Sequence, residues 1–149
     1  MRAKERGYAH RVDVLAGAHQ VWQALTDAGQ LARWCAPDAA ISPRQGGLFR
    51  ASVDRVTEFE AHIDVFEPPR RLRLMYLPSP ALPPAATVHV DDFILEPAGR
   101  GTIVRLLGSG VPATAEWDTQ YLRLRASWPQ ALSRLKVLVE KQAKTGAPP

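Results

Sequence analysis

A histidine and an aspartate in the run "HVDD", residues 89–92, are the side chains of this sequence best suited to catalysis. His89 and Asp91 are two positions apart, so in a β-strand both side chains point to the same face of the sheet. A carboxylate beside an imidazole in a pocket of low dielectric constant can keep the ring protonated or orient it as a general base. We therefore take His89 and Asp91 as candidate catalytic residues.

The hydrophobic pattern does not decide which face of this strand is buried. Phe93 and Leu95 share the face of the candidate pair. The opposite face carries three aliphatic side chains, namely Val88, Val90 and Ile94. We favour burial of the aliphatic face, which predicts that His89 and Asp91 face water. If the other face is buried, the pair lies inside the protein.

Other signatures of catalysis and metal binding do not occur in the sequence. It contains no phosphate-binding glycine loop and no serine in a nucleophile elbow. The four histidines are at least nine residues apart and the single cysteine is Cys35, whereas a metal site needs clustered ligands. We therefore expect neither a metal site nor a cofactor. Cys35 follows a helix end and could be partly exposed, but no neighbouring cation is evident that would make it a reactive thiol.

A second group of candidates is aromatic and would line a pocket for a small ligand, since such pockets are mostly apolar with few polar anchors. The group consists of Trp34, Phe49, Tyr76, Phe93, Trp117, Tyr121 and Trp128. Trp34 lies beside a proline break and is placed to close one mouth of the pocket, while Tyr76 and Tyr121 offer hydroxyl groups. Core packing is the alternative role for the aromatic residues of the C-terminal segment.

The elements that must position these residues follow from the periodicity of apolar side chains. Residues 8–15 read as a strand, and residues 17–27 and 30–36 as two short helices. The longest period-two run, residues 56–66, predicts a strand with one buried and one wet face. The remaining predicted strands are 48–53, 72–77, 87–97 and 101–108, the last two joined as a hairpin by "PAGRG". The proline-rich segment 78–86 is expected to be a mobile surface loop.

One long helix is predicted from near Thr114, because apolar residues recur there every three or four positions over about six turns. Pro129 interrupts this pattern and predicts a kink or a division of the helix. An antiparallel sheet with one apolar face would curl around such a helix. We therefore expect an α+β fold, with about six to seven antiparallel strands around one long C-terminal helix. The domain would span residues 8–142, with tails at 1–7 and 143–149.

Composition excludes several classes of function. The 149 residues suit one domain, and no stretch is long and apolar enough to span a membrane. The net charge of +4 is scattered along the chain, whereas nucleic-acid-binding proteins gather basic residues on one face. We expect no nucleic acid as a partner. A single cysteine and no signal sequence favour a cytoplasmic location.

Several stretches, in order along the chain, resemble the helix-grip superfamily of START-related lipid-transfer domains, birch-pollen-allergen-like proteins and polyketide cyclases. They are "VWQALTDAGQLARW", "GGLFR", "VFEPPRRLRL", "ILEPAGRGTIVRLLGSG" and "SWPQALSRLKVLVE". The sequence is most similar to the family named after the activator of the heat-shock protein 90 ATPase. This resemblance implies a deep cavity between helix and sheet that often holds an apolar or amphipathic molecule, and it implies no universal catalytic residue.

Three functions follow as hypotheses. The first is binding of a small hydrophobic or aromatic ligand in a cavity between the long helix and the curved sheet. The second is regulation of a chaperone ATPase through the basic edge formed by Arg70, Arg71 and Arg73. The third is a cyclase or hydrolase activity on an aromatic, polyketide-like substrate, with His89 and Asp91 as acid and base. An exposed edge strand would also allow a homodimer.

Overall fold

The computed structural model describes residues 4–145, so parts of both predicted tails, residues 1–3 and 146–149, lie outside it. The strands are β1 (Glu5–Val14), β2 (Ala40–Ile41), β3 (Leu48–Ala51), β4 (Phe59–Glu67), β5 (Arg71–Tyr76), β6 (Val90–Ala98) and β7 (Gly101–Pro112). The helices are α1 (Ala18–Thr26), α2 (Ala28–Trp34) and α3 (Asp118–Lys144), with a 3₁₀ turn, η1 (Ala115–Trp117), before α3.

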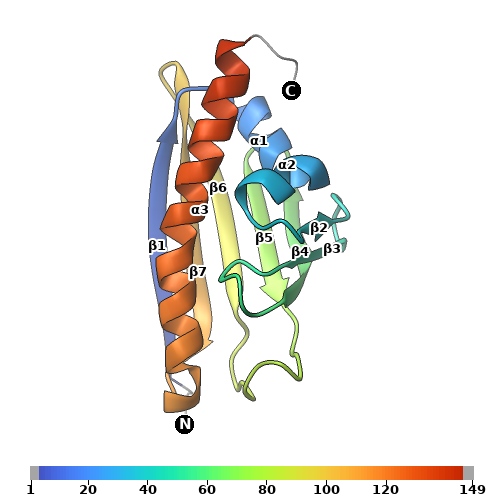
Figure 1. Cartoon of the computed structure of the whole chain (residues 1–149), viewed down its shortest axis with the longest axis vertical. Coiled ribbons are helices and arrows are strands. Elements are labelled where there is room, and N and C mark those ends of the chain that lie inside the picture. The colour runs from blue at the N-terminus through green and yellow to red at the C-terminus, as the bar shows by residue number, and fades with distance from the viewer. Residues whose placement is uncertain (1–3, 146–149) are drawn as a thin grey trace.

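The strands form one antiparallel sheet in the order β1-β7-β6-β5-β4-β3-β2. Figure 1 shows α3 lying across one face of this sheet, with α1 and α2 beside its C-terminal half. The predicted α+β helix-grip fold, with two short helices after the first strand, is therefore confirmed. Alternation in β4 also follows the prediction, since Phe59, Ala61 and Ile63 are buried while Glu60 faces outward.

The predicted division of the long helix at Pro129 is wrong. Helix α3 runs without interruption from Asp118 to Lys144, and Figure 1 shows one continuous rod. Pro129 removes the hydrogen bond to the carbonyl of Arg125 four residues earlier. Both residues lie on the exposed side of α3, where water can satisfy that carbonyl. The buried stripe next to them is unbroken, because Trp128 and Leu132 still pack on the sheet.

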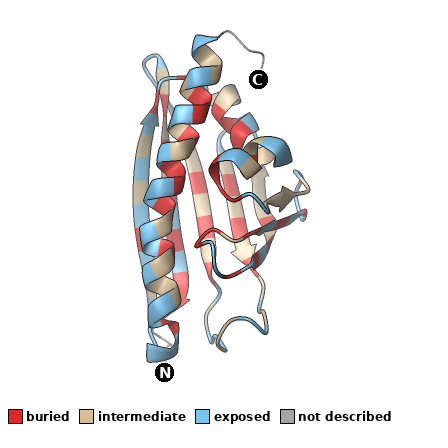
Figure 2. Cartoon of the chain, in the orientation of Figure 1, coloured by how far each residue is buried: buried red, intermediate tan, exposed pale blue. Residues whose placement is uncertain are grey.

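Helices α1 and α2 close one end of the groove between α3 and the sheet, which we call the sealed end (Figures 1 and 2). Asp27 separates the two helices and caps α2 by accepting a hydrogen bond of 3.0 Å from the backbone N–H of Gln30. Trp34 at the end of α2 is buried, and its Nε1 donates to the carbonyl of Ala24 at 2.7 Å. Trp22 of α1 packs edge-on against Phe66.

The first strand begins three residues earlier than the sequence predicts, because Glu5 and Arg6 pair with β7. β1 is an edge strand, and side chains of α3 bond to its backbone. The Tyr121 hydroxyl donates to the carbonyl of Gly7 at 2.7 Å, and Lys136 Nζ donates to the carbonyl of Asp13 at 2.6 Å. Helix α3 ends at Lys144, two residues past the predicted end of the domain. Among residues 4–145, no helix is long and apolar enough to cross a membrane.

Candidate ligand-binding site

The buried face of β6 is the one that carries His89 and Asp91, so the preferred prediction that these residues face water is wrong. His89 is 6% exposed and Asp91 0%, and Phe93 and Leu95 are buried with them. Val88, two residues before the strand, is exposed instead. The sequence could not predict this orientation, because both faces of β6 carry apolar residues. It is set by hydrogen bonds that Asp91 makes to side chains of other strands.

Asp91 is the centre of a buried polar cluster built from three strands and the residue before β6. The Tyr8 hydroxyl from β1 donates to Asp91 Oδ1 at 2.5 Å, and the Tyr76 hydroxyl from β5 donates to Oδ2 at 2.8 Å. The Tyr8 hydroxyl also lies 2.8 Å from His89 Nε2. The His89 ring stacks on the Tyr76 ring with centroids 4.4 Å apart. We refer to Tyr8, Tyr76, His89 and Asp91 as the Tyr–His–Asp cluster.

These contacts assign the proton on the His89 ring. A phenol hydroxyl has one hydrogen to donate, and a carboxylate can only accept a hydrogen bond. The hydroxyl hydrogen of Tyr8 therefore points to Asp91. The Tyr8 oxygen must then accept from His89, which places a hydrogen on Nε2. The other ring nitrogen, Nδ1, has no hydrogen-bond partner among the described residues. It is not among their fully buried unpaired polar atoms, so it remains accessible. In the neutral ring, Nδ1 is a free acceptor.

Burial keeps both phenols in the donor form. Burial raises the pKa of Tyr8 and of Tyr76 well above 10.0, and the neighbouring Asp91 raises both pKa values further. The hydroxyls therefore retain their hydrogens throughout the neutral range. The cluster is a carboxylate held by two neutral donors, with one imidazole beside it.

Gly108 makes room for the cluster. It pairs with Tyr8 across β1 and β7, and a Cβ atom at this position would lie 2.2 Å from Cε1 of the Tyr8 ring. Any larger residue would push the ring off β7 and away from Asp91. Gly110 has φ of 78°, and a Cβ there would collide with the carbonyl of Val88. The "GSG" run of the sequence is thus a packing requirement of this site.

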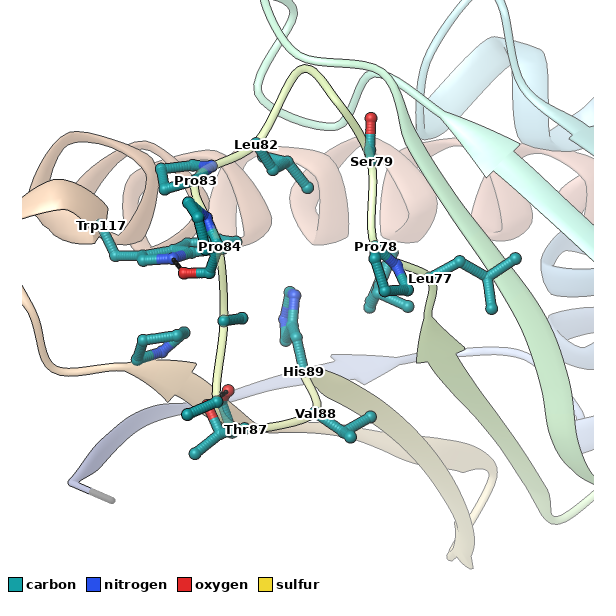
Figure 3. A pocket seen from close by; sticks show the side chains of 15 residues that line it. Leu77, Pro78, Ser79, Leu82, Pro83, Pro84, Thr87, Val88, His89 and Trp117 are labelled. Atoms are coloured by element: carbon teal, nitrogen blue, oxygen red, sulfur yellow. Dashed lines mark hydrogen bonds between the residues drawn. The ribbon is translucent and has the colours of Figure 1, made fainter.

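A pocket of about 360 Å³ opens beside the cluster, where β5 ends and β6 begins. Most of its wall comes from the connecting segment 77–88, which we call the proline loop. Figure 3 shows the His89 ring standing between the Pro78 and Pro84 sides of this loop. The remaining wall is formed by Tyr76, Gly110, Pro112 and Trp117. The pocket is thus mostly apolar, with His89 within it.

Besides a backbone bond of 2.7 Å from the Leu77 N–H to the carbonyl of Glu60, two side-chain hydrogen bonds hold the proline loop to the rest of the protein. Trp117 Nε1 donates to the carbonyl of Pro84 at 3.1 Å, and the Thr87 hydroxyl donates to the carbonyl of Gly110 at 2.6 Å. The pocket therefore lies at the N-terminal end of α3, which we call the open end of the groove. The sequence predicts a cavity between the long helix and the sheet, and this pocket lies at the N-terminal end of that helix rather than under its middle. There, Leu124, Trp128 and Leu135 fill the space against the sheet.

The structure brings three of the predicted site residues together at the pocket, namely Tyr76, His89 and Trp117. Asp91 lies behind His89 and does not line the pocket. Four other predicted ligand-binding residues, Trp34, Phe49, Phe93 and Trp128, are buried core residues outside this wall. Tyr121 is half-buried and bonds to β1.

Sequence reasoning missed Tyr8 and the proline loop. Tyr8 lies 81 positions before His89, and only the pairing of β1 with β7 brings them together. The loop was interpreted as a surface connection, although three of its prolines and Leu82 form part of the pocket wall. Its density of rigid apolar residues is the signal that could have indicated a wall.

The remaining candidates are the cysteine, the basic edge and a metal site. Cys35 is fully buried rather than partly exposed, and burial raises its pKa to about 12, so its thiol is unreactive. Two arginines of the basic edge are engaged in ion pairs, Arg71 with Asp92 at 2.7 Å and Arg73 with Asp64. Within residues 4–145, no three histidine, cysteine or carboxylate side chains are grouped as metal ligands.

The chain matches the model of one protein family, described as "Activator of Hsp90 ATPase homolog 1-like protein", over residues 16–140. This match spans most of the chain, so the helix-grip protein described above belongs to that family. The resemblance inferred from the sequence is thereby confirmed. No curated protein matches the chain.

Solved structures share the fold at low sequence identity. MLL2253 from Mesorhizobium loti is 22% identical, with a TM-score of 0.76 over 91% of this chain and 98% of that one. The Aha1 dimer from Colwellia psychrerythraea is 18% identical, with a TM-score of 0.75 over 91% and 96%. CalU16 from Micromonospora echinospora is 22% identical, with a TM-score of 0.70 over 95% and 80%. These similarities show the fold.

Proposed function

We propose that the protein binds a small, mostly apolar or aromatic molecule in the pocket beneath the proline loop, with His89 as the polar anchor. The observation that carries this proposal is the unpaired Nδ1 of His89 beside an apolar pocket of about 360 Å³. Ligand pockets have volumes of roughly 300–1,000 Å³ and few, fixed polar groups. The ligand would carry an O–H or N–H group that donates to Nδ1.

The fixed position of His89 supports binding with directional selectivity. Its ring is stacked on Tyr76 and bonded to Tyr8, so little side-chain freedom is lost when a ligand arrives. The flat, rigid side chains of the wall, such as Pro78, Pro84 and Trp117, suit a planar ring. An aromatic molecule with one donor group fits these features best.

The first test is titration with N-phenyl-1-naphthylamine, an apolar aromatic probe with one N–H group. We expect saturable probe fluorescence and quenching of Trp117 emission. His89→Ala should weaken probe binding by up to about tenfold, the effect of one lost hydrogen bond. His62→Ala, on the outer face of β4, is the matched control and should bind normally. Absence of saturable binding would refute the proposal.

Native mass spectrometry of freshly purified protein would complement this titration. A reproducible non-covalent adduct of a few hundred daltons, the range set by a pocket of this size, would give the mass of a natural ligand. Loss of that adduct in His89→Ala but not in His62→Ala would place the ligand in the pocket. An adduct that is as abundant in His89→Ala as in the wild type would place it elsewhere.

A second candidate function is suggested by the family description, which names a chaperone ATPase activator. Its contact surface would be the basic edge around Arg70, Arg71 and Arg73. Pairing of Arg71 and Arg73 with carboxylates lowers the positive charge that this edge offers to an acidic partner, so we rank it second. The test is the ATPase rate of the chaperone with the protein and with the triple Arg→Glu variant. An unchanged rate at saturating protein would exclude this function.

The cytoplasmic location and the homodimer remain predictions. The first rests on the single cysteine, and its test is the distribution of the protein on cell fractionation. The second has support from the printed description of the Colwellia psychrerythraea relative as a dimer. The mass given by native mass spectrometry tests it directly.

A further inference from the structure

We propose that the pocket is catalytic and that His89 acts in it as a general base, removing a proton from a carbon atom of an aromatic substrate. This inference rests on the proposed function, because it uses the same pocket and an aromatic ligand, with an acidic C–H group of the ligand in the place of the O–H or N–H donor at Nδ1. It goes further by giving the Tyr–His–Asp cluster a chemical task. The reaction class is proton transfer from carbon.

The geometry of His89 is that of an oriented base. Its ring lines the pocket, its Nδ1 has no partner among the described residues, and its Nε2–H is fixed by the Tyr8 hydroxyl at 2.8 Å. A general base must lie within reach of its substrate, with its ring held by a further group. Tyr8 holds the ring by its hydrogen bond and Tyr76 by stacking. His89 would be the catalytic residue, and both tyrosines positioning residues.

Asp91 supplies the charge that such a base requires. Its carboxylate is fully buried, and two phenol donors satisfy its oxygens without neutralising it. Burying an unpaired charge is costly. Among the described residues, His89 is the one group within ion-pair distance of Asp91 that can become cationic, with Nε2 3.7 Å from Oδ1. A proton transferred from the substrate to His89 would place a positive charge next to this carboxylate, which favours the transfer.

The chemical step needs no further reactant. Nδ1 of His89 takes a proton from a C–H bond that is activated by a neighbouring C=O or C=N group. The electrons of that bond stay on the substrate as an enolate-like anion, and the proton then returns to a second atom of the same molecule. Nothing is oxidised or reduced, and the histidine returns to its neutral form. The net reaction is an isomerisation within an aromatic carbon acid.

The test uses 5-nitrobenzisoxazole, an apolar aromatic probe for a base in a pocket. A base removes its ring C–H proton, the electron pair forms a nitrile, and the N–O bond breaks to release a coloured nitrophenolate. We expect saturable turnover above the rate in buffer. His89→Ala should lower kcat by about 10²-fold or more, the usual contribution of a general base, and added imidazole should restore part of it. His62→Ala should turn over normally.

Asp91→Asn and Tyr8→Phe separate a positioning role from a structural one. Both changes keep the shape of the side chain. If these residues act through His89, kcat falls at least several-fold while KM and the affinity for N-phenyl-1-naphthylamine stay unchanged. If they only stabilise the fold, the melting temperature changes and kcat does not. His89→Asn replaces His89→Ala should the latter fail to fold.

The outcomes distinguish this inference from the proposed function. Normal probe binding without saturable turnover, or equal kcat in His89→Ala and the wild type, would overturn catalysis and leave ligand binding intact. Absence of binding of both probes would overturn both proposals. Turnover that depends on His89 and is rescued by imidazole would support both.

Discussion

The two ends of the groove beneath α3 are closed in different ways. At the sealed end, α1 and α2 cover the sheet, and Trp34 satisfies its only donor on the carbonyl of Ala24. At the open end, the proline loop takes the place of helices, and a pocket remains beside His89. Figure 2 shows buried residues lining the groove, while the loop at the other end is largely exposed or half-buried. Sealing and access are thus divided between two segments of the chain.

The difference follows from the backbone structure of the two covering segments, the helices α1 and α2 and the proline loop. A helix satisfies its own internal N–H and C=O groups, so α1 and α2 can pack on the sheet without leaving polar atoms unpaired. The proline loop lacks that pattern, but four of its residues are prolines, which have no N–H to satisfy. Such a segment can border an apolar pocket at little cost in unpaired donors. The four following predictions test this division.

The largest effect is expected in the packed interior. Trp128→Ala removes a fully buried ring that packs on Phe93, and it should lower the free energy of unfolding by about 3–5 kcal/mol. Val137→Ala on the same helix, at a side chain that is 66% exposed, should change it by less than about 0.5 kcal/mol. Urea unfolding measures both. Equal small effects would mean that the interior is not tightly packed.

A second effect should appear at high pH. Unfolded Cys35 loses its proton near pH 9.0 and folded Cys35 near about 12, so between these values the unfolded state binds fewer protons. Stability then falls by about 1.4 kcal/mol per pH unit, with a further loss above pH 10.0 from Tyr8 and Tyr76. From about pH 8 to about pH 10.5 we expect a loss of about 4 kcal/mol.

Urea midpoints at the two pH values check this loss. Cys35→Ala at the sealed end should remove the part that begins near pH 9.0, and Tyr76→Phe at the open end should remove part of the loss above pH 10.0. Equal midpoints at both pH values in the wild type would show that these groups are not sealed from water.

A smaller effect should separate the two ends by function. Trp34→Phe leaves the carbonyl of Ala24 without its donor and should cost about 2 kcal/mol of stability. Because Trp34 does not line the pocket, the affinity for N-phenyl-1-naphthylamine should stay the same. A weakened affinity would restore the sequence-based prediction that Trp34 contacts the ligand.

The smallest change in stability is expected in the proline loop. Leu82→Ser removes a half-buried side chain from the pocket wall and should alter stability by less than about 1 kcal/mol. The affinity for N-phenyl-1-naphthylamine should fall about threefold to tenfold through lost apolar contact. Leu122→Ser, at an exposed leucine of α3, is the control and should leave affinity unchanged. An unchanged affinity in Leu82→Ser would show that the proline loop does not contribute to binding.

The sequence predicted those parts of the fold that depend on local periodicity. The alternation in β4, the stripe on α3 and the two short helices needed no knowledge of their neighbours. The effect of Pro129 was misjudged because the cost of a proline depends on whether the freed carbonyl reaches water. That exposure is known only once the helix is placed on the sheet.

The candidate site could be predicted only in part, because its geometry depends on contacts distant in sequence. His89 was identified from its spacing to Asp91, but the inward face of β6 is set by Tyr8 and Tyr76 on other strands. Gly108 is likewise explained only by the Tyr8 ring that crosses it. The residue types were visible in the sequence, whereas their assembly required the β1–β7 and β5–β6 pairings.

The bonds from Tyr121 and Lys136 to the backbone of β1 have a consequence for self-association. A bare edge strand is a template on which a strand of another molecule can grow into aggregates. Here two carbonyls of β1 are already occupied by α3, and the opposite edge, β2, is only two residues long. Sheet extension between molecules is therefore hindered at one edge and limited to a short strand at the other. Growth of fibrils by addition of strands should therefore be slow even in concentrated protein.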